Sequence, residues 1–196
     1  MFNRSSAFII CADGTWAKSF HTVLAEIGFG HIEHISKTKQ LSAVPFSRPL
    51  QFCFLTQAST SEEIRLATKI VRGHKHERHR FSPMIMLARE LSRPAIYDYI
   101  AAGLDDILQF PCSLKFMSSR LGRQLNRQLK YYETEDYFGP DRRRHHDDAA
   151  DVGDRRVGRS DFRRHLIRRD PFKGVEILDI YDHQADAQNV QREQAG

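Results

Sequence analysis

Residues 83–121 have the sequence PMIMLARELSRPAIYDYIAAGLDDILQFPCSLKFMSSRL, and this stretch decides the fold. It begins with a continuous apolar run that is typical of a buried parallel strand. Pro94 stands near the start of a helical pattern and Gly103 just after its end, so the two residues delimit a helix. A second strand is predicted at 105–110. An amphipathic helix is then expected over 113–132.

The residues before this stretch alternate between strands and helices in the same way. Apolar runs predict strands at 7–12, 31–35 and 50–56, and helical spacing follows each of them, although weakly after the second. Ser59 and Glu62 have the spacing of a capping box and predict the start of a helix after the third strand. Five strands alternating with helices predict a doubly wound parallel α/β sheet, for which we expect the flavodoxin-like order 2-1-3-4-5.

The chain changes character after residue 132. The later residues are polar, poor in aliphatic side chains and without clear periodicity. We therefore expect one domain over 1–132 and a largely irregular extension over 133–196. A short strand or helical turn around 177–181 is the only element predicted near the carboxyl end.

The composition is that of a globular protein, with 40% hydrophobic and 28% charged residues. The longest apolar runs are much shorter than the ~18 residues that a membrane span needs, and the amino terminus lacks the long apolar region of a signal peptide. We therefore expect a cytoplasmic protein without membrane insertion. Cys11, Cys53 and Cys112 are widely separated and lie in or beside apolar runs, which indicates buried free thiols rather than a zinc site.

The pattern of residues 83–121 resembles the second half of a CheY-like receiver domain, the module of response regulators in two-component signal transduction. The resemblance covers residues 7 to about 131. It is weaker before residue 83 than after it. It implies a phosphorylation site at the ends of the strands. In receivers an acidic pair binds Mg²⁺, an aspartate accepts the phosphoryl group, a threonine or serine and a lysine contact that group, and a proline in a cis peptide bond follows the lysine.

The residues of this site are almost all replaced. The corresponding positions hold Ala12, Asp13, Leu55 or Thr56, Ala88 and Phe110. No register shift restores the acceptor, because no acidic residue occurs between Glu33 and Glu62. Phosphoryl transfer needs a nucleophilic carboxylate, a metal and a cation, since its transition state is stabilised by electrostatics.

The sequence therefore predicts a degenerate receiver, or pseudo-receiver, that is not an enzyme and binds no Mg²⁺ at this site. We expect Leu55, Ala88 and Phe110 to fill the former pocket. The Phe110–Pro111 peptide bond is expected to be cis, as the resemblance implies and as only bonds to proline readily allow.

The extension contains the motif YFGPDRRR at residues 137–144, followed by further arginine pairs. This motif resembles the arginine-rich extension of alphaproteobacterial CheY-like proteins, among them the Cle group, which bind cyclic di-GMP and act at the flagellar motor. Residues 142–173 hold eleven Lys and Arg against six Asp and Glu, and ten of the eleven are arginine. The planar guanidinium suits bidentate contacts with phosphate and guanine.

We therefore predict a cyclic di-GMP site in the extension. In this hypothesis one side chain stacks on a base, an aspartate accepts from a guanine edge, and arginines contact phosphate and guanine. The residues are Tyr137 for stacking, Asp141 or Asp147 as acceptor, and Arg142, Arg143, Arg144, Arg155 and Arg156 as cations.

Three alternatives stay open. The same arginines could bind nucleic acid, which is the less favoured ligand. The extension could be inert while the pseudo-receiver docks on a partner protein through the last two predicted helices and the strand between them. An active phosphoacceptor is the least favoured alternative. The histidine-rich run at 72–80 favours a solvated basic loop over a metal site, because it lacks a ligand set at zinc spacing.

Overall fold

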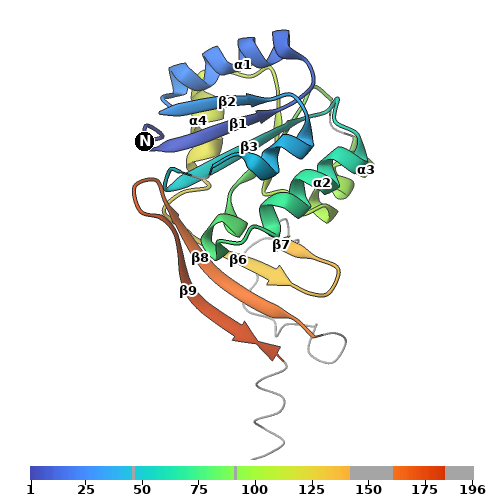
Figure 1. The fold of residues 1–196 in the computed structure, drawn as a ribbon, viewed down its shortest axis with the longest axis vertical. Helices are drawn as coiled ribbons and strands as arrows, with labels where there is room; N and C mark the ends of the chain where they lie inside the picture. The colour runs from blue at the N-terminus through green and yellow to red at the C-terminus, as the bar shows by residue number, and fades with distance from the viewer. Residues whose placement is uncertain (46, 91, 142–160, 184–196) are drawn as a thin grey trace, which may run out of the picture.

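The computed structural model describes residues 1–45, 47–90, 92–141 and 161–183. Its first sheet contains five parallel strands in the order β2-β1-β3-β4-β5, which confirms the predicted fold class (Figure 1). The strands are β1 (Ser5–Ile10), β2 (His31–Ile35), β3 (Leu50–Thr56), β4 (Met84–Ala88) and β5 (Asp106–Gln109). The cis Phe110–Pro111 bond is also as predicted.

Helices cover both faces of this sheet. They are α1 (Gly14–Ile27), α2 (Ser61–Arg72), α3 (Arg93–Ala101) and α4 (Leu114–Gly122), with short 3₁₀ helices η1 (Thr38–Ala43) and η2 (Glu77–Phe81). Helices α1 and α4 contribute to one buried cluster together with Phe52 and Phe54 of β3. Helix α2 contributes to the other, together with Cys53 and Leu55. This division follows from the alternation of side chains along a strand.

The start of α2 differs by one residue from the sequence prediction. Thr60 is the N-cap, and its hydroxyl accepts from the backbone N–H of Glu63 at 3.2 Å. The Glu63 carboxylate accepts in return from the Thr60 N–H at 2.8 Å. The capping box is therefore formed by Thr60 and Glu63 rather than by Ser59 and Glu62, whose spacing in the sequence is identical.

A second sheet follows the first, so the prediction of a largely irregular extension is wrong for the described residues. Its four antiparallel strands have the order β7-β6-β8-β9 and lie below the parallel sheet and its helices in Figure 1. They are β6 (Gln128–Glu133), β7 (Phe138–Pro140), β8 (Arg163–Asp170) and β9 (Gly174–Asp182). Strand β6 crosses the boundary that the sequence placed after residue 132, and the element expected at 177–181 is the middle of β9.

The helix expected over 113–132 is also wrong. Helix α4 ends at Gly122, and Asn126 adopts a left-handed conformation with a φ of 56° before β6 begins. Within β6, Leu129 and Tyr131 are buried while Gln128 and Lys130 are exposed, a strand period of two. Buried Leu129 and Tyr131 belong to the same cluster as α1 and α4, and this burial outweighs the helical spacing.

The second sheet packs on the amino ends of the parallel strands. At the turn between β8 and β9, Gly174 has a φ of 87°, and a Cβ at this position would lie 2.4 Å from the carbonyl oxygen of Pro49. Glycine is therefore required both by the turn and by the approach to β3. Ile167 of β8 and Val175 of β9 are buried in the cluster of the parallel sheet, so the two sheets share one core.

Candidate functional site

A cavity of about 620 Å³ lies at the carboxyl ends of β1, β3 and β4, where receivers carry their phosphorylation site. Its base is formed by Ile10 and Leu87, and one wall by Trp16, Phe110 and Pro111. The other lining residues come from the segments that follow β1, β2, β3 and β4. The expectation that side chains fill this pocket is therefore wrong.

The reason is the direction of the side chains at the strand ends. Leu55 and Ala88 are buried in the cluster beneath α2 and do not line the cavity. Thr56, one residue further along β3, lines it instead. Because neighbouring side chains on a strand point to opposite faces, Thr56 rather than Leu55 faces the cavity at this end of β3. Of the two residues that the resemblance aligns with the acceptor, the one that lines the cavity therefore carries a hydroxyl.

The two carboxylates that line the cavity, those of Asp13 and Glu63, both cap helices. Asp13 is the N-cap of α1, and its Oδ1 accepts from the N–H groups of Thr15 at 2.9 Å and Trp16 at 3.0 Å. Glu63 belongs to the capping box of α2. Each carboxylate stabilises a helix start that would otherwise expose unpaired donors. Asp13, which the resemblance aligns with the acidic pair of receivers, therefore caps α1.

Phe110 occupies the position of the receiver lysine and joins an aromatic cluster. Its ring lies edge-on to Phe20, with centroids 5.3 Å apart, and to Trp16, with centroids 5.9 Å apart. Trp16 and Phe20 are stacked at 5.1 Å. Trp16, Phe110 and Pro111 thus give one side of the cavity an aromatic and apolar lining.

The described residues contain no group of three or more potential metal ligands. The histidine rings of the run at 72–80 contact one another instead: His76 and His79 are stacked with centroids 4.7 Å apart, and His74 is tilted against His79 with centroids 4.9 Å apart. Burial, together with the two neighbouring imidazoles, lowers the pKa of His79 to about 4. This run forms part of η2 and its approach rather than an open loop.

Two of the residues predicted for cyclic di-GMP lie in the described part of the extension. The Tyr137 hydroxyl donates to the carbonyl oxygen of Pro140 at 2.7 Å, and the Asp141 N–H donates to the carbonyl of Lys130 at 2.9 Å. Tyr137 also lines a groove of about 770 Å³ between α2, α3 and the turn from β6 to β7. The other predicted residues, Arg142, Arg143, Arg144, Asp147, Arg155 and Arg156, lie outside the described residues.

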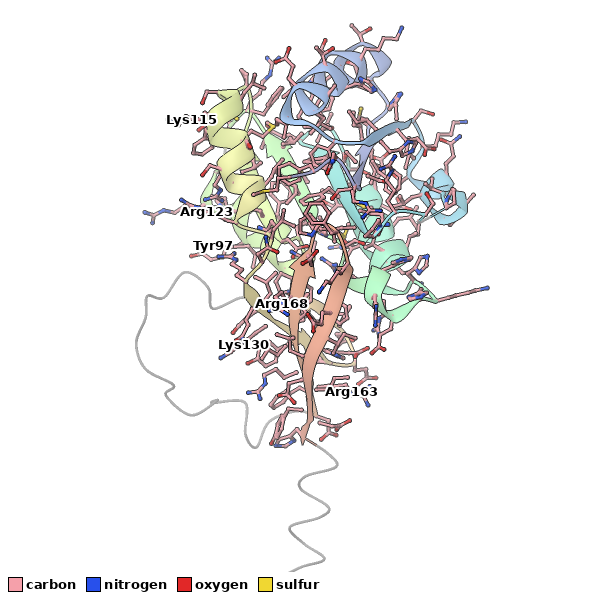
Figure 2. All side chains as sticks on the ribbon, turned by 90° about the vertical axis from the view of Figure 1, so that its left-hand side faces the viewer. Tyr97, Lys115, Arg123, Lys130, Arg163 and Arg168 are labelled. Carbon is pink, nitrogen blue, oxygen red and sulfur yellow. The ribbon has the colours of Figure 1, made fainter. Side chains whose placement is uncertain are left out.

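The face of α3, β5 and α4, which corresponds to the expected docking face, carries exposed apolar side chains. Tyr97 is 70% exposed, Phe116 49% and Leu114 42%. Figure 2 shows Tyr97, Lys115 and Arg123 along the same side of the molecule. This face is therefore both apolar and basic.

Among the described residues, no helix is long and apolar enough to cross a membrane.

Sequence reasoning missed a buried ionic network between the two sheets. Asp105 accepts from Arg72 at 2.8 Å and from Arg169 at 2.7 Å, and the side chains of all three are at most 4% exposed. Tyr131 donates to Asp105, and Arg169 donates to Tyr131. The only signal in the sequence was the position of Arg169. It lies two residues after the buried Ile167 and so faces the same side of β8, although its charged neighbours suggest a solvated cation.

The sequence matches no protein-family model and no curated protein. Among solved structures, a response regulator from Thermotoga maritima matches with a TM-score of 0.49 and 13% identity, over 61% of this chain and 95% of that one. A CheY-like receiver domain protein from Methanospirillum hungatei matches with 0.48 and 14%, over 61% and 92%. A pilus assembly-related protein from Burkholderia pseudomallei matches with 0.47 and 14%, over 63% and 90%. The fold class itself stands on the strand order of this chain.

Proposed function

We propose that the chain is a cytoplasmic signalling protein that is not an enzyme, a pseudo-receiver that acts without phosphorylation. One observation supports this proposal: the carboxylates that line the cavity both cap helices, and the residue at the end of β3 that lines it, Thr56, carries a hydroxyl. An aspartyl phosphate requires a free carboxylate with a metal beside it. We expect neither a phosphoryl group nor Mg²⁺ at this end of the sheet.

Cyclic di-GMP is the signal that we propose for the arginine-rich segment. The support is the composition of residues 142–160, which hold six arginines and no lysine. The arginines of β8 instead pair with carboxylates of the described residues: Arg163, Arg164, Arg168 and Arg169. Each charge-assisted contact contributes roughly 1.5–3 kcal/mol, so four or five contacts exceed an ordering cost of about 2–5 kcal/mol. The flanking strands β7 and β8 belong to a folded sheet, so both ends of the segment are fixed. A segment with fixed ends loses less conformational entropy on binding than a free tail.

A partner protein is the proposed output, bound through the face of α3, β5 and α4. Large exposed apolar side chains rimmed by charged ones are typical of protein interaction sites. Tyr97, Leu114 and Phe116 supply the apolar part, and Lys115 and Arg123 the charges. A component of the flagellar motor or another signalling protein fits the resemblance of the extension. The cationic rim favours an acidic surface on that partner.

Calorimetric titration of the full chain with cyclic di-GMP, GTP and a short RNA tests the ligand. We expect micromolar binding of cyclic di-GMP and a loss of at least about a hundredfold when Arg142, Arg143 and Arg144 are replaced together by alanine. A matched control replaces three exposed arginines elsewhere, Arg4, Arg78 and Arg93, and should leave the affinity unchanged.

A lysine triple variant at residues 142–144 separates two kinds of recognition. Lysine keeps the charge but not the planar fork, so binding of nucleic acid through phosphates alone tolerates it, whereas guanine recognition does not. Full binding of cyclic di-GMP by the lysine variant, or none by the parent, would refute the dinucleotide proposal. The pseudo-receiver would then be a protein-docking module only.

A further inference from the structure

The cavity at the carboxyl end of the parallel sheet has the position of a ligand site. It lies where the strand order reverses between β1 and β3, and open α/β sheets bind their ligands at this point. Its volume of about 620 Å³ is within the roughly 300–1,000 Å³ that small-molecule pockets occupy. The proposed function makes no use of this space.

The walls of the cavity favour a flat apolar molecule. Trp16 and Phe110 present aromatic surfaces, with Pro111 beside them and Leu87 beneath. The Phe110 ring is held edge-on by Phe20 at a centroid distance of 5.3 Å, so this wall is fixed before any ligand arrives. Aromatic walls bind planar ring systems by stacking and edge contacts, each of which contributes beyond the area that it buries.

The polar side chains of the cavity that make no hydrogen bond or ion pair of their own are mainly hydrogen-bond donors. Thr56 is 8% exposed, and its hydroxyl makes no hydrogen bond with any residue that the structure describes. Arg89, an exposed residue, also lines the cavity, and its guanidinium makes no ion pair within the described part of the chain. The carboxylates of Asp13 and Glu63 are instead occupied by helix N–H groups.

These two donors are near each other in the fold. Thr56 of β3 is the register partner of Leu87 in β4, and Arg89 follows two residues later. The backbone at Arg89 is tied to β3 by Gln57, whose Oε1 accepts from the Arg89 N–H at 2.9 Å, while the Arg89 carbonyl accepts from Gln109 at 3.2 Å. Both donors therefore stand on strand ends that hydrogen bonds hold together.

The charges of the cavity disfavour a ligand with more than one negative charge. Arg89 is the one cation that lines it, whereas Asp13 and Glu63 each add a negative charge to the lining described here. A nucleotide or a free phosphate carries more charge than one guanidinium offsets beside two carboxylates. One carboxylate, bound by the guanidinium and the hydroxyl, matches the available donors.

We propose that this cavity binds a planar aromatic monocarboxylate, with its rings against Trp16 and Phe110 and its carboxylate on Arg89 and Thr56. In this arrangement the pseudo-receiver binds a small molecule at the end of the sheet where receivers carry a phosphoryl group. None of the residues that line the cavity belongs to the arginine-rich segment, so this proposal does not depend on cyclic di-GMP binding.

The single tryptophan of the chain makes the site directly observable, because Trp16 lines the cavity. We would titrate the full chain with biphenylcarboxylate and follow both Trp16 fluorescence and the heat of binding. Biphenylmethanol, which has the same rings without the charge, is the matched ligand. We expect saturable binding of the carboxylate that is at least about tenfold tighter than that of the alcohol.

Two variants assign the donors. Arg89→Gln should weaken the carboxylate by about tenfold or more and leave the alcohol unchanged, and Thr56→Val should weaken the carboxylate by a smaller factor. Arg93→Gln, an exposed arginine four residues further along the chain and outside the cavity, is the control and should change neither. Thermal unfolding verifies that each variant is folded.

Three results would overturn the proposal: no saturable binding of either ligand, equal affinity for the carboxylate and the alcohol, or a carboxylate affinity that Arg89→Gln leaves intact. A titration with cyclic di-GMP in the presence of saturating biphenylcarboxylate distinguishes this site from the one proposed above. We expect the two ligands to bind independently, and competition between them would contradict separate sites.

Discussion

The two ends of the parallel sheet differ in polarity, and in the opposite sense to what the receiver resemblance implies. At the carboxyl end, where charge would serve phosphoryl transfer, the structure has an apolar cavity walled by Trp16 and Phe110. At the amino end, where a receiver resemblance implies no chemistry, Arg72, Asp105 and Arg169 are buried together. The comparison shows that the buried ionic network of Arg72, Asp105 and Arg169 lies where the two sheets meet.

The buried charges are tolerated because every one of them is paired several times. The carboxylate of Asp105 accepts from Arg72, Arg169, Tyr131 and the Met84 N–H. Burial alone would raise the pKa of Asp105, but the guanidinium groups of Arg169 and Arg72 hold that pKa well below its ordinary value. Such a network offsets the cost of desolvation only while it is complete.

The largest effect is therefore expected at the amino end. Asp105→Asn leaves two buried guanidinium groups without a negative partner and should lower the free energy of unfolding by about 3–5 kcal/mol. Asp98→Asn, an exposed position on α3, is the control and should change it by less than about 0.5 kcal/mol. Denaturant unfolding measures both. A loss below about 1 kcal/mol for Asp105→Asn would show that the network does not join the sheets.

A smaller, pH-dependent effect is expected at Glu133, at the edge of the same network. Its carboxylate accepts from His165 and from Arg80, and these bonds lower its pKa from 4.5 to about 2. Because the pKa is lower in the folded state, the stabilisation is present above about pH 5 and is lost as the pH falls towards 2. Glu133→Gln should therefore cost about 2–3 kcal/mol at pH 7.

The pH profile of the free energy of unfolding is the measurement for Glu133. The difference between the parent and Glu133→Gln should shrink as the solution is acidified. Glu135→Gln, an exposed residue two positions along the chain, provides the control and should follow the parent at every pH. Parallel profiles for Glu133→Gln and the parent would contradict the assigned role of this carboxylate.

A smaller change in the free energy of unfolding is expected from the helix cap Asp13, at the carboxyl end of the parallel sheet. Asp13→Ala should lower the free energy of unfolding by about 1 kcal/mol, whereas Asp13→Asn should retain most of the cap, since asparagine also accepts from the first N–H groups. Added Mg²⁺ should stabilise none of the three proteins. If Mg²⁺ stabilised the parent and Asp13→Asn lost that effect, Asp13 would be a metal ligand rather than a cap.

The sequence predicts the parallel sheet well because its strands are continuous apolar runs. Strand β3 begins and ends at the predicted residues, Leu50 and Thr56, since every side chain between them is buried. Strand β6 was missed because the buried residues Leu125, Leu129 and Tyr132 have the spacing i, i+4, i+7 and also suit a helical face. Only the left-handed Asn126 and the packing of the second sheet decide against a helix, and neither can be seen in local periodicity.

The candidate site, too, can be predicted from the sequence only in part. The absence of a carboxylate at the end of β3 is visible in the sequence, because no acidic residue occurs between Glu33 and Glu62. The cavity that remains is not visible, since it depends on which face of the strand Leu55 and Ala88 enter. The burial of Arg169 is equally hidden, because an arginine between charged neighbours has the pattern of a solvated residue until its partner strand is known.

The central claim, that the carboxyl end of the sheet has lost phosphoryl chemistry, is tested most directly by incubating the full chain with radiolabelled acetyl phosphate and Mg²⁺. We predict no incorporation of label and no change in Trp16 fluorescence when beryllofluoride and Mg²⁺ are added, since Trp16 borders the site. An acid-stable, hydroxylamine-labile phosphoprotein would contradict this account.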